Sequence, residues 1–289
     1  MNKRLEIKKE IEFNKEIFVE FFDTIIQNIK NEGMFNLNGS SEVALTFFYE
    51  ALVSGFNEEA FTALGFASEF KTASLNSMSA STETISFRLL DHDLRVKTGK
   101  PDHNFNSYEW NTAFDLALIL KDKEKLNLLH EIECWKVKGR QPFHRSYAHL
   151  RHLIHTGQIK NINKQFDEIS EIANSDLTAF IGLDGNKPKI LKGLSNEILL
   201  LRYPLVQLYK LIIDGNEDGF NRLLSVFIEN KKAWIKKNEE QNNSSYWADL
   251  PLLGICSFAI ENNININYES EYIPKWLYIK DFETKQDLK

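Results

Sequence analysis

The amino-acid sequence predicts an all-α protein, built as a multi-helix bundle or as an irregular α-solenoid-like array, with at most a short β-like segment near the C-terminus. Strand patterns are nearly absent, and no TPR or HEAT consensus is present. With 289 residues, 43% of them hydrophobic, the chain can bury a sizeable core as one large domain or two small ones. The helical steps of three, four or seven begin with Ile7, Ile11, Phe18, Phe22, Ile25 and Ile29.

Helices are expected along most of the chain. The opening helix is long and amphipathic, and Ser41 is placed to cap a second helix that ends at Gly55. A third helix begins near Asn57. The same periodicity predicts further helices, separated by turns, over residues 83–97, 106–120, 122–134, 142–156, 160–175, 195–213, 217–238 and 250–262.

The C-terminal fifth of the chain carries the clearest local signals. Asp249 stands where the N-cap of a helix should be, because its carboxylate can accept backbone N–H bonds and the following Pro251 is tolerated in a first helical turn. The helix ends near Asn262. Apolar and polar residues then alternate over 264–268 as in a short strand, and residues 270–274 restart a helical turn.

The connection over residues 181–193 divides the helical pattern, because it places three glycines and a proline among charged residues. It separates an N-terminal helical bundle, residues 1–180, from a C-terminal helical unit, residues 194–280, unless it is a loop inside one continuous domain. Residues 281–289 are expected to form a polar tail.

The composition argues against several classes of protein. The charged start has no apolar signal segment, and no later window approaches the roughly 18 apolar residues that a bilayer requires, so we expect a cytoplasmic protein without a membrane partner. Cys134 and Cys256 lack the spacing of a disulfide framework or a thiolate zinc site. The net charge of −6 argues against a nucleic-acid partner, and nothing indicates a cofactor.

Charge is unevenly distributed along the chain. Residues 31–70 contain six acids and no lysine or arginine, whereas residues 121–164 contain ten bases and four acids. Such asymmetry can steer a charged partner toward one side of a protein. The acids of residues 31–70 form either a binding surface or an ordinary solvated face, and the pattern leaves both interpretations open.

Histidine and aspartate residues cluster in two segments, and each is a candidate metal-binding site. His149, His152 and His155 follow at i, i+3 spacing, so two imidazoles can share a metal ion while the third is rotated away. The Asp-His-Asp run at 91–93 superficially resembles metal-dependent phosphohydrolases. Polar packing and ion pairing are the simpler interpretations. Since GxGxxG, P-loop, GxSxG and HExxH motifs are missing, we expect neither catalytic residues nor a bound metal.

The stretch LPLLGICSFAIENNININYESEYIPKWL resembles the closing motif of the Immunity protein 49 family of bacterial polymorphic toxin systems. Asn262 and Asn263 stand where many relatives have a glycine-containing turn. The preceding helix is similar to the penultimate helix of the family. The resemblance rests on the LPL helix, the S-x-Y-I-P ending and the apolar face of the preceding helix: Leu250, Pro251, Leu252, Ala259, Ser270, Tyr272, Ile273 and Pro274, together with Phe220, Leu223, Leu224 and Trp234.

The resemblance implies an all-α protein without catalytic activity that binds and neutralises a cognate toxin domain. An acidic surface suits the covering of a basic active site such as that of a nuclease, because charge complementarity speeds association while a few buried anchors supply most of the affinity. Inhibition by occlusion and inhibition from a remote site both stay open. The candidate toxin-binding residues on the second and third helices are Glu42, Tyr49, Glu50, Glu58, Glu59 and Glu69, and those on a competing C-terminal rim are Glu269, Glu271, Tyr272 and Trp276.

Two other functions are weighed against this one. A helical-repeat adaptor for another protein predicts a concave groove. A His/Asp metallohydrolase predicts stoichiometric bound metal.

Overall fold

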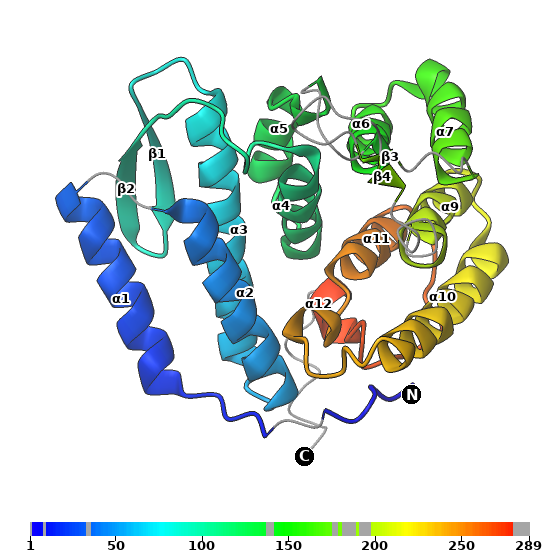
Figure 1. Cartoon of the computed structure of the whole chain (residues 1–289), viewed down its shortest axis with the longest axis horizontal. Coiled ribbons are helices and arrows are strands. Elements are labelled where there is room, and N and C mark those ends of the chain that lie inside the picture. The colour runs from blue at the N-terminus through cyan, green and yellow to red at the C-terminus, as the bar shows by residue number, and fades with distance from the viewer. Residues whose placement is uncertain are drawn as a thin grey trace.

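The computed structural model describes residues 2–7, 10–32, 36–136, 142–174, 179–180, 189–190 and 198–279. Helices occupy most of that length, which confirms the all-α prediction (Figure 1). The α-helices are α1 (Lys15–Glu32), α2 (Leu37–Val53), α3 (Asn57–Ser79), α4 (Ser107–Leu120), α5 (Lys123–Glu131), α6 (Pro142–His155), α7 (Ile159–Asn174), α9 (Tyr203–Ile213), α10 (Glu217–Lys237), α11 (Leu250–Glu261) and α12 (Lys275–Ile279). The 3₁₀-helices η1 (Cys134–Lys136) and η3 (Ser244–Tyr246) and the π-helical turn η2 (Ile198–Arg202) connect them.

The prediction of a helix over residues 83–97 is wrong, because this segment forms an antiparallel hairpin of β1 (Thr84–Leu89) and β2 (His92–Lys97). Its apolar residues alternate with polar ones, which places Ile85 opposite Val96 and buries both. The two-residue repeat of apolar side chains therefore determines the structure of this segment, and their helical spacing does not. The hairpin packs against α1 and α3 at one edge of the molecule (Figure 1). A second, two-residue pair joins β3 (Ala179–Phe180) to β4 (Lys189–Ile190).

The first two helices begin at other residues than expected. Asn14 accepts hydrogen bonds from the backbone N–H groups of Glu16 and Ile17, so α1 starts at Lys15 and not near Ile7. Asn36 caps α2 through the N–H of Gly39. Ser41 lies inside α2, where its hydroxyl donates a 2.9 Å hydrogen bond to the carbonyl of Ala67 and joins α2 to α3.

The alternating residues 264–268 follow α11 without forming a strand. Their backbone is bound instead by two polar side chains of α10. Glu217 Oε2 accepts from Asn265 N at 2.9 Å, and Asn221 Oδ1 accepts from Asn267 N at 3.0 Å. These side chains supply the hydrogen bonds that a neighbouring strand would otherwise make.

The N-terminal residues run along the C-terminal segment, in a contact that the helical pattern does not predict. Asn2 N donates to the carbonyl of Glu269 at 2.9 Å, and Glu271 N donates to the carbonyl of Asn2 at 3.0 Å. The Tyr272 hydroxyl accepts from Leu5 N at 3.1 Å. In Figure 1 the N-terminus accordingly lies below α10 and α12.

One hydrophobic cluster reaches from Phe13 before α1 to Tyr278 in α12. Inside it, Phe22 of α1 meets Phe66 of α3 with ring centroids 4.0 Å apart. A second cluster surrounds Trp110 of α4. The division of the chain into units 1–180 and 194–280 stays a prediction, and much of the 181–193 connection and all of the 281–289 tail lie outside the described residues.

The helix α4 contributes to both hydrophobic clusters and contacts α3, α5, α6 and α11. Its close approach to α11 depends on Gly254, where an added Cβ would meet Asp115 Cα at 3.2 Å. Ser257 of α11 also donates a 2.8 Å hydrogen bond to the carbonyl of Leu118. Among the described helices, none combines the length and apolar character needed to cross a membrane.

Candidate functional site

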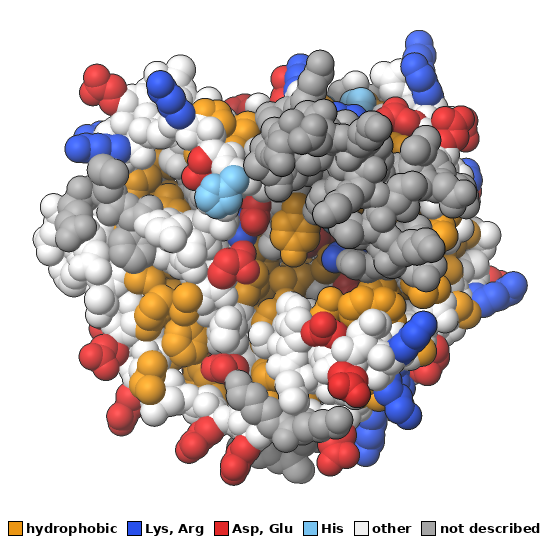
Figure 2. Space-filling view, in the orientation of Figure 1, with side chains coloured by type: hydrophobic (Ala, Val, Ile, Leu, Met, Phe, Trp, Pro, Cys, Tyr) orange, Lys and Arg blue, Asp and Glu red, His pale blue; other side chains and the backbone are white. Residues whose placement is uncertain are grey.

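A cavity of about 250 Å³ lies where α2, α4, α6, α9, α10 and the start of α11 meet. In Figure 2 the surface is hollowed near the middle of the view, and hydrophobic side chains lie at the bottom of the hollow. Aromatic and polar groups line it together. The residues used below are Glu42 and Tyr49 of α2, Tyr108 and Asp115 of α4, His144 and Tyr147 of α6, Arg202 of η2, Lys231 of α10 and Asp249 before α11.

Two buried ion pairs stand at the base of the cavity. Arg151 of α6 is fully buried and pairs with Asp115, while its Nε donates to the Tyr209 hydroxyl at 3.2 Å. Lys231 Nζ donates to Asp249 Oδ2 at 2.7 Å. Burial raises the pKa of Asp115. Burial by itself would lower the pKa of Arg151, but the neighbouring Asp115 carboxylate more than offsets this, so the guanidinium stays protonated. These charges are therefore compensated within the fold.

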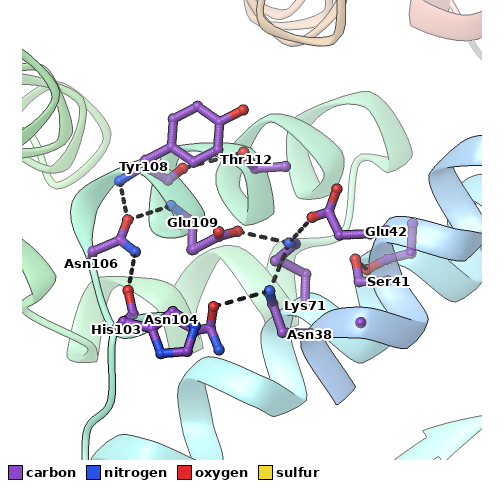
Figure 3. A network of polar contacts seen from close by, with 12 residues as sticks. Asn38, Ser41, Glu42, Lys71, His103, Asn104, Asn106, Tyr108, Glu109 and Thr112 are labelled. Atoms are coloured by element: carbon purple, nitrogen blue, oxygen red, sulfur yellow. Dashed lines mark hydrogen bonds and ion pairs between the residues drawn. The ribbon is translucent and has the colours of Figure 1, made fainter. Parts of the chain in front are cut away.

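A fully buried lysine organises the mouth of the cavity (Figure 3). Lys71 Nζ of α3 donates to Glu42 at 2.5 Å, to Glu109 at 2.7 Å and to Asn38 at 2.9 Å. The Glu42 side chain is 57% exposed, whereas that of Lys71 is 0% exposed. Two carboxylates share one ammonium, so the group carries one net negative charge at the mouth.

Two tyrosines of the cavity wall are nearly buried, and the hydroxyl of one of them lacks a hydrogen-bond partner within the described part of the chain. Tyr49 and Tyr147 are 6% and 3% exposed, and the Tyr147 hydroxyl is buried without a partner. Burial raises the pKa of both hydroxyls, so they stay neutral. Since buried polar groups are normally hydrogen-bonded, the Tyr147 hydroxyl can form a hydrogen bond with a ligand or with water.

The histidines pack among aromatic rings. His152 lies 4.4 Å from Trp135 and 5.3 Å from His130 between ring centroids, and His155 lies 4.3 Å from Phe258. Burial lowers the pKa of His130 to about 4. Nowhere in the described residues do three His, Cys, Asp or Glu side chains group so that they could hold a metal ion. The Asp-His-Asp run lies at the turn of the hairpin, where His92 contacts Lys30.

The acids predicted on α2 and α3 do not form one uncompensated surface. Glu59 pairs with Lys15 at 2.5 Å and Glu69 with Lys125 at 2.6 Å, as Glu42 does with Lys71. The three lysines lie outside residues 31–70, so the sequence window overstated the local charge. Glu58 is exposed and Glu50 is half-buried.

Tyr49, a predicted anchor residue, lies buried in the cavity wall together with Glu42 at the mouth. The C-terminal rim is largely engaged by the N-terminal residues. Tyr272 is 2% exposed, and the backbone N–H of Arg4 donates to Glu271 Oε2 at 3.1 Å. Glu269 is exposed and Trp276 half-buried.

Sequence reasoning missed Lys71, Tyr108, Glu109 and Tyr147 as site residues. Lys71 carried a signal, since it is the one base in the largely apolar stretch from Phe61 to Leu75. A charge inside such a helix is seldom fully buried unless it is paired. The other three gave no comparable signal, because their spacing is that of ordinary core positions.

Comparisons with known proteins give one result. No curated protein and no solved structure matches the chain. The family model described as Immunity protein 49 matches residues 44–277, from α2 through most of α12, and thus covers most of the chain. The matched span contains the greater part of the cavity wall as well as the C-terminal motif. The chain belongs to the Immunity protein 49 family.

Proposed function

We propose that this protein binds a cognate bacterial toxin domain and neutralises it in the cytoplasm of the producing cell. Membership of the Immunity protein 49 family over residues 44–277 carries the proposal. Binding without catalysis agrees with the perturbed groups of the cavity, which are neutral tyrosines and histidines and ion pairs closed on themselves. In this proposal the protein covers the active site of the toxin, and that toxin is a nuclease.

The proposed contact surface is the side of α2 and α3 that borders the cavity mouth, with Glu42, Glu50 and Glu58 as its acids. The Lys71 group supports this choice, because it holds Glu42 and Glu109 beside each other with one excess negative charge. Such a surface attracts the cationic groups with which nucleases hold phosphates. Glu59 and Glu69 contribute less, since each has its own lysine.

The test is a co-expression rescue. The C-terminal domain encoded by the adjacent upstream gene is expressed in a susceptible host with and without this protein, and growth and co-purification are followed. Growth arrest that a stable complex relieves is the expected result. A toxic domain that neither binds this protein nor is relieved by it contradicts the proposal.

Charge reversal then tests the surface. The double variant Glu42→Lys/Glu58→Lys should slow association with the toxin domain and make the rate less dependent on salt, because it removes electrostatic steering. Glu239→Lys/Glu240→Lys is the matched control, since these acids follow α10 outside the proposed surface. Equal association rates for both variants would place the interface elsewhere, with the C-terminal rim of Glu269 and Trp276 as the next candidate.

A further inference from the structure

We propose that the cavity is the socket for one arginine side chain of the toxin, which enters past Glu42 and Tyr108 and reaches the hydroxyls of Tyr49 and Tyr147. This inference rests on the proposed function. It names the chemistry that the cavity selects, and it is testable without the toxin.

The size of the cavity limits what can enter. Its volume of about 250 Å³ is below the roughly 300–1,000 Å³ typical of sites for drug-sized ligands. One extended side chain is a better match than a cofactor. Affinity at protein interfaces is concentrated in a few anchors that fill such pockets, and arginine is among the commonest of them.

Two tyrosine hydroxyls supply hydrogen-bond acceptors inside the socket. Tyr49 and Tyr147 are both more than nine-tenths buried, and the Tyr147 hydroxyl is buried without a hydrogen-bond partner among the described residues. A phenolic oxygen accepts a hydrogen bond from an N–H donor. A guanidinium carries five such donors in a planar fork, so it can satisfy separate acceptors at once.

The charges along the α2 wall favour a cation. Glu42 binds Lys71 through Oε1, and Figure 3 shows its other carboxylate oxygen directed away from the lysine. The charged groups that act on the Tyr49 hydroxyl are the acids Asp249 and Glu42. Lys231 is held by Asp249 at 2.7 Å. The excess negative charge on the α2 side of the mouth therefore comes from Glu42 and Glu109, which share Lys71.

The opposite side of the cavity contains a cationic side chain. Arg202 of η2 lines the cavity, and its charge lowers the pKa of His144 in addition to the larger effect of burial. A partner cation would therefore follow the α2 wall. Tyr108 is 46% exposed at the mouth beside Glu109, where its ring can stack on a guanidinium.

The experiment uses the purified full chain with tyrosine labelled at its ring carbons and records tyrosine NMR signals, assigned by Tyr→Phe variants. The probe is N-acetyl-arginine amide. Its matched controls are the neutral isostere N-acetyl-citrulline amide and the anionic N-acetyl-glutamate amide. We expect saturable shifts of the Tyr49, Tyr108 and Tyr147 signals with the arginine probe, and at least tenfold weaker binding of both controls.

Variants locate the binding. Glu42→Gln keeps the side-chain shape and should raise the Kd of the arginine probe about two- to fivefold, as loss of a partly exposed ion pair does. Tyr49→Phe and Tyr147→Phe should raise it about three- to tenfold each, as loss of one ordinary hydrogen bond does. Glu239→Gln, in the exposed turn after α10, should leave it unchanged. Circular dichroism verifies that each variant is folded.

Three results overturn the inference: no saturable shift with the arginine probe, equal binding of the citrulline probe, or preference for the glutamate probe. Each is separable from failure of the immunity function. If the rescue succeeds while the arginine probe does not bind, the socket is wrong and the function stands. If the probe binds in the cavity but no toxin domain is neutralised, the function is wrong.

Discussion

Lys231 Nζ donates a 2.7 Å hydrogen bond to Asp249 Oδ2, while Asp249 Oδ1 accepts from the backbone N–H of Leu252 at 3.0 Å. One carboxylate therefore caps α11 and binds a buried lysine of α10. Both side chains are nearly inaccessible, at 6% for Lys231 and 8% for Asp249. The cap is a local feature of the sequence, whereas the lysine comes from 18 residues away.

Replacing this carboxylate should destabilise the protein strongly. Asp249→Ala removes the cap and leaves Lys231 buried without its anion, and breaking such a pair costs about 3–5 kcal/mol. The control is Asn216→Ala, which removes the cap of α10 at an exposed site and should cost about 1 kcal/mol. Urea unfolding measures both. Equal losses in the two variants would show that Lys231 contributes nothing beyond the cap.

The buried lysine at the cavity mouth is a second stability determinant. Lys71→Met removes hydrogen bonds to two carboxylates and leaves Glu42 and Glu109 beside each other, which should cost about 1.5–3 kcal/mol. Lys15→Met breaks the Lys15–Glu59 pair, whose lysine side chain is 65% exposed, and should shift the unfolding midpoint little, because solvent screens an exposed pair. The midpoints of thermal unfolding compare the two. A smaller shift for Lys71→Met than for Lys15→Met would refute this ranking.

The contact between α4 and α11 depends on the absence of a side chain at Gly254. Gly254→Ala would place a Cβ 3.2 Å from Asp115 Cα and 3.3 Å from its carbonyl oxygen. Neither atom can move without the helix, so we expect a loss of about 1–3 kcal/mol. Gly65→Ala is the control, because nothing lies within 4 Å of its Cβ, and it should stabilise α3 by about 0.4–1 kcal/mol. Chemical denaturation of both variants gives the comparison, and a neutral Gly254→Ala would contradict the tight helix contact.

Stability should fall on mild acidification. Burial lowers the pKa of His130 to about 4 and that of His144 to about 3, and it also lowers those of His152 and His155. A histidine of the unfolded chain has a pKa of about 6.5. Below that pH the unfolded state gains protons that the folded state does not, until the pH reaches the folded-state pKa. Burial raises the pKa of Asp115, which opposes the trend, but four histidines act against it.

Urea unfolding at about pH 7 and about pH 5 checks this, since these values lie on either side of the histidine pKa of the unfolded chain. The free energy of unfolding should be lower at the acidic pH, and His130→Gln should reduce the difference. A protein that is equally stable or more stable at the acidic pH would show that the histidines are solvated.

Local sequence patterns determined much of the helical fold. Asp249 before Leu250 specified the start of α11, and helices over residues 106–120, 142–156 and 217–238 agree closely with α4, α6 and α10. These features depend on neighbours within one or two helical turns, which the sequence displays directly. The alternating runs that contain Ile85 and Val96 also favoured a hairpin. The spacing of the same apolar residues resembles that of a helix, however, and this led to the wrong prediction.

The tertiary structure alone decided the site. Lys71 meets Glu109 across 38 residues, and Arg151 meets Asp115 across 36. Such pairs depend on how the helices pack, and the same residues in another packing would face solvent or each other. The pairing of Glu42, Glu59 and Glu69 with lysines far from them in the sequence follows from packing in the same way, and so does the enclosure of the Tyr147 hydroxyl. The sequence by itself determined the helices and the family, whereas helix packing decided which charges are paired, which are buried and where a cavity remains.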